Sequence, residues 1–271
     1  MKLFTNKKKL QNEIKNTNNI SFVPTMGALH KGHQSLIKKS VKMSNKTLVS
    51  IFVNPRQFDN KKDFFAYPKS FKKDKAILER LKVTYLYKPS YSDIYNFKTK
   101  NKIFLHPFSK KLCGKFRVNH FYGVVDVVNR FIEIIKPKKI FLGNKDFQQL
   151  FLVKKHIQKN GINTKVISCR TIRNKKFIAY SSRLKRLKKY ENKKLVEIIT
   201  ILNDYKKKLI RKRIRHNFNY IKNKLLSAGA KKVDYVEIIN LKSLKKPKVF
   251  GNNCNLFFAF YIKNVRFIDY F

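Results

Sequence analysis

Residues 23–36 read VPTMGALHKGHQSL and concentrate residue types that are scarce elsewhere in this chain. Gly27 and Gly32 are two of its eight glycines, and His30 and His33 are two of its six histidines. An apolar stretch precedes them and apolar residues at helical spacing follow, which predicts a strand, a loop and a helix. Glycines let the backbone approach an anion, and a helix start offers free N–H groups. The segment therefore indicates a phosphate site, the alternative being a solvated turn whose histidines only cap the helix.

Strands and helices alternate on both sides of this segment. The predicted strands are 20–23, 47–53, 85–87, 140–142 and 164–169, and the predicted helices are 34–43, 71–81, 124–135 and 148–159. This alternation is typical of βαβ units and predicts an α/β fold with a Rossmann-like, doubly wound parallel sheet. The first, second and fourth strands run into loops rich in Gly, Asn, His, Gln or Asp. Since ligands bind beyond the carboxyl ends of such strands, the chemistry is expected at one edge.

The pattern changes after about residue 170. Two basic amphipathic helices are predicted at 195–209 and 218–226, and two strands at 233–239 and 256–262. The chain is therefore expected to form two domains, residues 1–170 and a smaller α+β domain of residues 171–271.

The composition is globular but very basic, with 64 Lys+Arg against 15 Asp+Glu and a net charge of +49. Such a charge is typical of proteins that bind nucleic acids or anionic membranes. The enriched residues are also those of A/T-rich codons, and the lysines are spread over the whole length. We therefore favour compositional drift over a nucleic-acid partner.

Cysteines and apolar runs suggest where the chain works. Its three cysteines, Cys113, Cys169 and Cys254, are far apart and form no Cys-x-x-Cys pair, so neither a disulfide framework nor a zinc site is expected. The N-terminus lacks the apolar core of a signal peptide, and no apolar run reaches the roughly 18 residues of a membrane helix. A cytoplasmic protein without a membrane partner is the expectation.

Several blocks carry a resemblance to a known family. The loop resembles the His-x-Gly-His signature of the adenylyl-transferring superfamily, and PTMGALHKGHQSL is similar to the pantoate–β-alanine ligase family. Further blocks resemble that family in order along nearly the whole chain: 50–74 (SIFVNPRQFDNKKDFFAYPKSFKKD), 143–150 (GNKDFQQL), 171–183 (TIRNKKFIAYSSR), 234–238 (DYVEI) and 266–269 (RFID).

The resemblance implies a two-step ligase reaction in the cytoplasm. Pantoate attacks the α-phosphate of ATP to give pantoyl adenylate and pyrophosphate, and β-alanine then displaces AMP to give pantothenate. ATP is thus a substrate, Mg²⁺ accompanies its phosphates, and the family implies a homodimer. Two alternatives remain: a related nucleotidyltransferase with another acceptor, and a basic nucleic-acid-binding protein that retains a decayed nucleotidyltransferase fold.

The resemblance also implies residue roles. His33 would be the proton donor, with His30 beside it and Lys145 as the cation on the phosphates. Gln57 and Gln149 would bind pantoate, and the C-terminal domain would close over ATP. The implied ATP-binding residues are Met26, Gly27, Ala28, Leu29, His30, Lys31, Gly32, His33, Gly143, Asn144, Lys145, Asp146, Ile172, Tyr180, Ser181, Ser182 and Arg183.

Several of these roles keep an alternative, and metal ligands are not assigned. Lys145 could be one of the many ordinary lysines, and Gln149 could be an ordinary residue of a helix surface. Gln57 could instead cap the Asn-Pro turn before it, and the two serines could cap the segment that follows them. Asp74 is a weaker candidate for a magnesium contact, the alternative being an ordinary carboxylate on a helix surface.

The chain departs from the family pattern at several loop positions. Asn144 replaces a glutamate, Val118 and Asn119 replace a Pro-Gly pair, and Leu184 replaces an asparagine. Phe177 replaces a glycine before the Ser-Ser-Arg loop, and Tyr180 replaces a smaller apolar residue. A phenylalanine at a positive φ would strain that turn. These departures are expected to affect efficiency and loop closure more than the type of reaction.

Overall fold

The computed structural model describes residues 1–59, 61–211 and 215–271, which form two compact units. The N-terminal unit contains residues 1–109 and 117–172, and the C-terminal unit contains residues 110–116 and 173–271. The units therefore change over between Ile172 and Arg173, close to the expected boundary at 170. The short segment 110–116 groups with the C-terminal unit, which the sequence pattern did not indicate.

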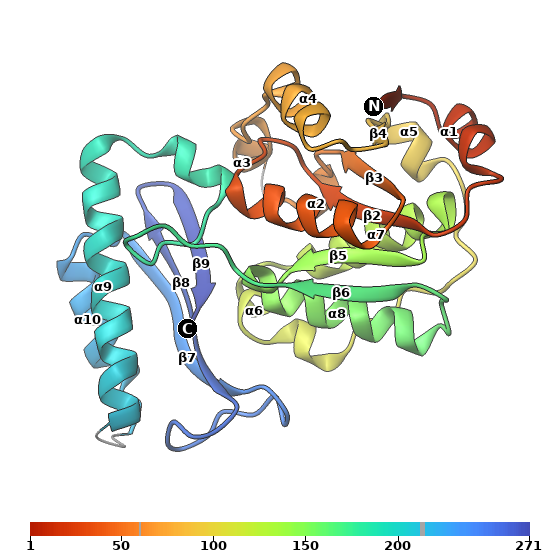
Figure 1. Cartoon of the computed structure of the whole chain (residues 1–271). Coiled ribbons are helices and arrows are strands. Elements are labelled where there is room, and N and C mark those ends of the chain that lie inside the picture. Colours follow the sequence, from red (N-terminus) through yellow and green to blue (C-terminus); the bar gives the residue numbers. More distant parts are fainter. Residues whose placement is uncertain (60, 212–214) are drawn as a thin grey trace. The chain divides into compact units, whose positions relative to one another are not determined.

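The N-terminal unit is built on a six-stranded parallel sheet (Figure 1). Its strands are β1 (Lys2–Phe4), β2 (Ile20–Thr25), β3 (Lys46–Ile51), β4 (Tyr85–Tyr87), β5 (Lys139–Gly143) and β6 (Lys165–Cys169). Their order in the sheet is β1-β4-β3-β2-β5-β6, so the direction of winding reverses between β2 and β5. The predicted doubly wound sheet is confirmed, and this reversal is where such folds bind ligands.

Helices cover both faces of this sheet. Its helices are α1 (Lys7–Ile14), α2 (Lys31–Met43), α3 (Lys61–Phe65), α4 (Phe71–Arg80), α5 (Tyr91–Tyr95), α7 (His120–Ile135) and α8 (Phe147–Lys159). Alternation along β2 explains the two layers. Val23 packs in a cluster with residues of α2 and α4, whereas the neighbouring Phe22 packs against Phe131 of α7 on the other face.

Helix α7 is the central helix of its layer. Twelve of its 16 residues are buried, among them Phe131, whose ring also contacts Phe52 and Tyr87. A helix that is apolar around most of its circumference belongs in a protein interior. Its first turn lies against the short 3₁₀ helix Pro55–Gln57 that follows β3, and this contact becomes important at the site.

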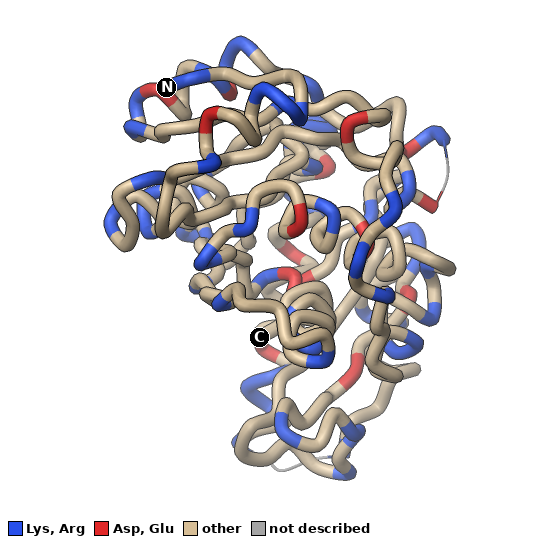
Figure 2. The backbone as a smooth tube through the Cα atoms, turned by 90° about the vertical axis from the view of Figure 1, so that its right-hand side faces the viewer, with Lys and Arg blue, Asp and Glu red and all other residues tan. Residues whose placement is uncertain are grey.

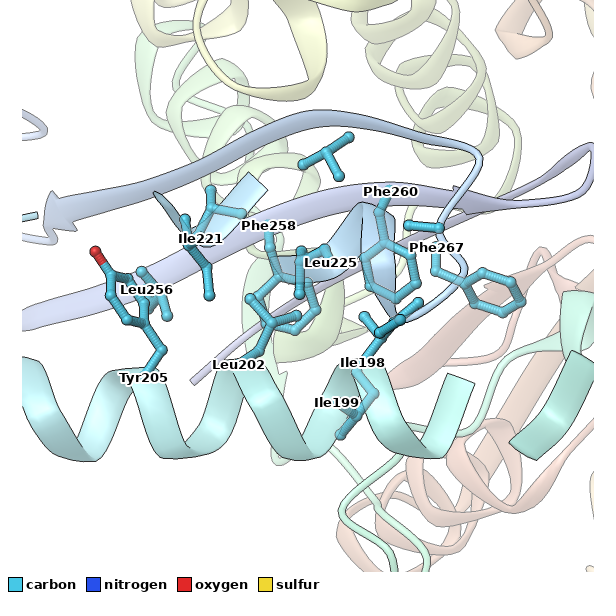
Figure 3. Close-up of a cluster of buried hydrophobic side chains, with 14 of the residues drawn as sticks. Ile198, Ile199, Leu202, Tyr205, Ile221, Leu225, Leu256, Phe258, Phe260 and Phe267 are labelled. Atoms are coloured by element: carbon cyan, nitrogen blue, oxygen red, sulfur yellow. The ribbon is translucent and has the colours of Figure 1, made fainter. Parts of the chain in front are cut away.

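The C-terminal unit is an antiparallel sheet packed on helices. Strands β7 (Lys232–Asn240), β8 (Cys254–Ile262) and β9 (Val265–Tyr270) pair in that order, and α9 (Lys189–Arg211) and α10 (Phe218–Ser227) pack against them. Figure 3 shows Leu202 and Tyr205 of α9 pointing toward Phe258 and Leu256 of β8. The unit also includes the short α6 (Cys113–Phe116). The predicted small α+β arrangement is confirmed.

Turns in this chain use few glycines. Ten described non-glycine residues have a positive φ, a conformation that side chains disfavour. They are Asn19, Ala28, Lys82, Leu112, Asn119, Lys136, Phe177, Leu244, Asn253 and Lys263. Phe177 has φ +60°, so the expected strain at this position is present.

Candidate active site

Three loops that carry the predicted site residues follow neighbouring strands. Residues 26–33 follow β2, the segment up to Gln57 follows β3, and residues 143–146 follow β5. Because β3, β2 and β5 are adjacent and parallel, these loops leave the sheet at its carboxyl edge, at the reversal of winding. The three loops therefore meet at one edge of the sheet, as expected, and their part in the chemistry stays a prediction.

The glycine at the start of the histidine loop is required by both conformation and space. Gly27 has φ +77°, and a Cβ there would lie 3.0 Å from Asp74 Oδ2 and 3.1 Å from Ile51 Cγ2. Behind it, the amides of Ala28 and Leu29 donate to the two Asp74 carboxylate oxygens, each over 2.8 Å. The loop is thus fastened to α4.

Asp74 therefore has a structural task. Its side chain is 1% exposed, and Ser70 Oγ donates to it over 3.2 Å in addition to the two loop amides. These hydrogen bonds hold the carboxylate inward. The geometry therefore argues against both earlier interpretations of Asp74, a magnesium contact and an ordinary carboxylate on the helix surface. Within the described residues, no group of three His, Cys, Asp or Glu side chains could hold a metal ion.

His30 and His33 lie together at the N-terminus of α2. His30 is the N-cap, and its Nδ1 accepts from the Gly32 amide over 3.1 Å. The two rings stack with centroids 3.9 Å apart and planes inclined by 25°. His30 thus does cap the helix, as the simpler alternative held. The first turn of α2 carries no acidic residue, so the helix dipole and these imidazoles form a site that favours an anion.

Gln57 presents its side-chain amide beside this loop. Its Nε2 lies 2.9 Å from Met26 Sδ, and its Oε1 accepts from Asn54 Nδ2 over 3.3 Å. Asn54 is 1% exposed and receives a hydrogen bond from Tyr95 Oη over 2.8 Å. Burial, with the charge of Asp126, raises the pKa of Tyr95, which keeps this hydroxyl protonated as a donor. Gln57 both joins the Asn-Pro turn and carries an amide able to donate and accept.

The loop after β5 supplies a cation and a buried acceptor. Lys145 Nζ lies 3.5 Å from Asp146 Oδ1, and its side chain is largely buried. Asn144 Oδ1 is buried and has no hydrogen-bond partner among the residues described here. An isolated buried acceptor is costly unless a donor reaches it, so this oxygen is suited to a ligand hydroxyl. Gln149 follows in the first turn of α8 and is half-buried.

The remaining predicted residues lie around the change of unit. Ile172 closes the N-terminal unit, while Tyr180, Ser181, Ser182 and Arg183 belong to the C-terminal unit. Ser181 caps a 3₁₀ helix, Ser182–Arg186, by accepting from the Arg183 amide over 3.3 Å, and Ser182 is buried. This capping agrees with the simpler interpretation of Ser181. Their contact with ATP stays a prediction.

The turn before these serines is anchored within its own unit. Arg173 makes two hydrogen bonds to the Asp269 carboxylate, Nη1 to Oδ2 over 2.5 Å and Nη2 to Oδ1 over 3.0 Å. Its Nη1 also donates to the Phe177 carbonyl over 2.9 Å. The strained Phe177 turn is thereby tied to β9, so the replacement of glycine leaves a defined turn.

Sequence reasoning missed several residues around Gln57. Asn54 and Tyr95 were given no role, and Gly123 was left just outside the predicted helix 124–135, although it lies within α7. Arg117 and His120 flank the altered pair Val118 and Asn119 and were given no role of their own. A glycine inside a strongly apolar helix is a signal of close backbone approach and could have drawn attention to Gly123.

Basic residues are distributed over the molecule. Figure 2 shows Lys and Arg along the whole backbone trace. This distribution along the chain agrees with compositional drift. Among the described residues no helix is both long and apolar enough to cross a lipid bilayer.

Comparisons with known proteins agree with one another. A family model described as pantoate-beta-alanine ligase matches residues 2–271. A pantothenate synthetase from Sulfurihydrogenibium sp. is 37% identical over 259 residues, covering 92% of this chain and 90% of its own. One from Francisella tularensis subsp. novicida is 38% identical over 265 residues, covering 97% and 92%.

Solved structures give the same result. A Francisella tularensis pantoate-beta-alanine ligase, complexed with beta-gamma ATP and beta-alanine, superposes with a TM-score of 0.84 at 37% identity, covering 100% of this chain and 97% of its own. A pantothenate synthetase from Thermus thermophilus reaches 0.89 at 26% identity, covering 100% and 99%. Nothing in these comparisons supports the nucleic-acid-binding alternative.

Proposed function

Because this chain belongs to the pantoate–beta-alanine ligase family, we propose that it condenses pantoate with β-alanine at the expense of ATP. A pantoate carboxylate oxygen bonds to the α-phosphorus of ATP, and the bond from that phosphorus to the bridging oxygen breaks, releasing pyrophosphate. The β-alanine amine then attacks the acyl carbon. AMP leaves, the nitrogen loses a proton, and pantothenate remains.

The observation that carries this proposal is that three loops with suitable side chains leave the sheet at the same edge. The stacked pair His30 and His33 at the start of α2 offers donors and a positive helix end to ATP phosphates. Lys145, after β5, adds a compact cation where charge grows on the departing pyrophosphate. Gln57, after β3, offers an amide to the hydroxy acid. In this proposal His33 donates to the phosphate being cleaved.

Other residues take supporting roles in the proposal. Backbone groups of the histidine loop and of Gly143–Asp146 line the nucleotide, and Gln149 binds pantoate with Gln57. Arg183 and the two serines supply further donors to ATP from the C-terminal unit. Mg²⁺ would arrive bound to ATP and screen its phosphates. The described residues offer no group of three His, Cys, Asp or Glu side chains as ligands for it.

The test is product formation by the purified protein. Pyrophosphate release should require pantoate, and AMP release should require both pantoate and β-alanine. His33→Ala should reduce both rates by at least about 100-fold. His106→Ala, which alters a histidine outside the proposed site, serves as the matched control and should stay near wild type. A folded protein that releases no AMP with both substrates would refute the proposal.

The same family membership leads us to propose a homodimer that works in the cytoplasm. Light scattering after size exclusion would give twice the chain mass of 32.3 kDa for a dimer. A mass equal to one chain at assay concentration would refute this part of the proposal alone.

A further inference from the structure

The Gln57 backbone carbonyl is held by two side chains, Arg117 from the loop before α7 and His120, the first residue of α7. His120 Nδ1 lies 2.6 Å from this oxygen, and Arg117 Nη2 lies 3.1 Å from it. A carbonyl oxygen has two lone pairs, so two donors satisfy it. Arg117 and His120 lie 60 and 63 positions after Gln57 in the sequence. They fix the backbone of Gln57, the residue proposed to bind pantoate.

The contacts between these two side chains define the form of His120. Arg117 Nη1 lies 2.9 Å from His120 Nε2, and a guanidinium can only donate. Nε2 must therefore accept, which leaves the ring proton on Nδ1, where it donates to the Gln57 carbonyl. Asp59 Oδ2 in turn accepts from Arg117 Nε over 2.5 Å, and the Arg117 side chain is only 11% exposed. Each hydrogen bond of this network thus has a defined donor: Arg117 donates to Asp59 and to His120, and His120 donates to the Gln57 carbonyl.

One turn into α7, Gly123 brings the two backbones into direct contact. A Cβ at this position would lie 2.2 Å from the Arg56 carbonyl oxygen and 3.1 Å from the Gln57 nitrogen. The Gly123 carbonyl accepts from Asn54 Nδ2 over 3.0 Å. The short 3₁₀ helix that bears Gln57 is therefore held along its length by α7.

The loop between Arg117 and His120 contains the two altered residues Val118 and Asn119. Asn119 has φ +60°, a left-handed conformation that asparagine tolerates better than most side chains. Val118 is 79% exposed and so imposes nothing on the packing. The replacement of a Pro-Gly pair thus leaves both donors directed at Gln57.

We propose that Arg117 and His120 are positioning residues of the pantoate site, which act through the Gln57 carbonyl and touch no substrate themselves. This inference rests on the proposed function. It predicts that removing the His120 donor lets the Gln57 segment shift, which weakens pantoate binding and leaves ATP binding at the neighbouring loop largely intact.

Three variants test the inference, with KM and kcat measured for each substrate. His120→Ala should raise the KM for pantoate about five- to tenfold, the effect of one ordinary hydrogen bond, and change the KM for ATP by less than about twofold. His120→Asn places an amide N–H near the Nδ1 position and should restore the pantoate KM to within about twofold of wild type.

His216→Ala is the matched control. His216 also bonds to a backbone carbonyl, with Nε2 2.7 Å from the Val236 oxygen, but it lies in the C-terminal unit. It should lower the unfolding temperature without changing the pantoate KM. An active wild type whose His120→Ala variant is folded and keeps its pantoate KM would overturn the inference alone. An inactive wild type would overturn the inference together with the proposed function.

Discussion

Replacing Asp74 by alanine should loosen the histidine loop and destabilise the N-terminal unit. The substitution removes the acceptor of the Ala28 and Leu29 amides, each 2.8 Å away and buried. Leaving a buried donor unpaired costs about 1–3 kcal/mol, so the two together cost about 2–6 kcal/mol. At about 2–4 °C per kcal/mol for a unit of this size, the unfolding temperature should fall by at least about 4 °C.

Calorimetry and ATP kinetics would measure the two consequences separately. Because the freed amides belong to the loop proposed to line ATP, the KM for ATP should rise by about tenfold or more. Glu79→Ala is the control on the same helix, since the Glu79 side chain makes a surface ion pair with Lys75 at 3.7 Å. An Asp74→Ala protein that unfolds at the wild-type temperature, and differs only in its Mg²⁺ requirement, would refute this reasoning and restore the metal contact.

Three further outcomes are expected. Lys145→Met should lower kcat by about 10²–10³, because the cation acts on charge that develops in the transition state, and a steady-state kcat within about threefold of wild type would contradict that role. Phe177→Gly should raise the unfolding free energy by about 1 kcal/mol by relieving the left-handed backbone, as thermal melts would show; a lower melting temperature would count against strain there. Burial lowers the pKa of His156 from 6.5 to about 4. Above pH 6.5 the histidine is neutral in both the folded and the unfolded state, so stability is highest there. As the pH falls toward 4 the unfolded state takes up a proton first, and the free energy of unfolding should drop by up to about 3 kcal/mol. Urea titrations at about pH 7 and 4.5 should show the loss in wild type and a smaller one in His156→Gln; equal losses would exclude His156 as the cause.

Periodicity was sufficient for the central architecture because it reflects burial directly. Adjacent residues such as Phe22 and Val23 face different helix layers, and the strands stand out as short apolar runs. Some elements at the edges of the two sheets were not predicted, because their hydrophobic pattern in the sequence is weak. Strand β1 has three residues, none of them buried, and α1 buries only Leu10 and Ile14 among lysines. Strand β9 alternates buried and half-buried residues, which was not recognised as a strand.

The candidate site divides in the same way. The residue types and order of the histidine loop, of Gln57 and of Lys145 could be recognised locally, and strand adjacency brings their loops to one edge. The contacts that hold these loops join residues far apart in the sequence. Asp74 lies 45 and 46 positions from the amides it accepts, and no local pattern distinguishes it from a surface carboxylate. Long-range pairing of this kind is decided by the tertiary fold.

The positive-φ turns determine how much further change this protein tolerates. Each side chain held in the left-handed region costs about 1 kcal/mol relative to glycine, somewhat less for asparagine. Ten such residues, Lys82, Lys136, Leu244 and Lys263 among them, remove a large share of the roughly 5–15 kcal/mol by which a typical domain is stable. We therefore expect this chain to tolerate destabilising core substitutions poorly. Glycine at these four turns would restore the margin, which makes them the first positions for a thermostable variant.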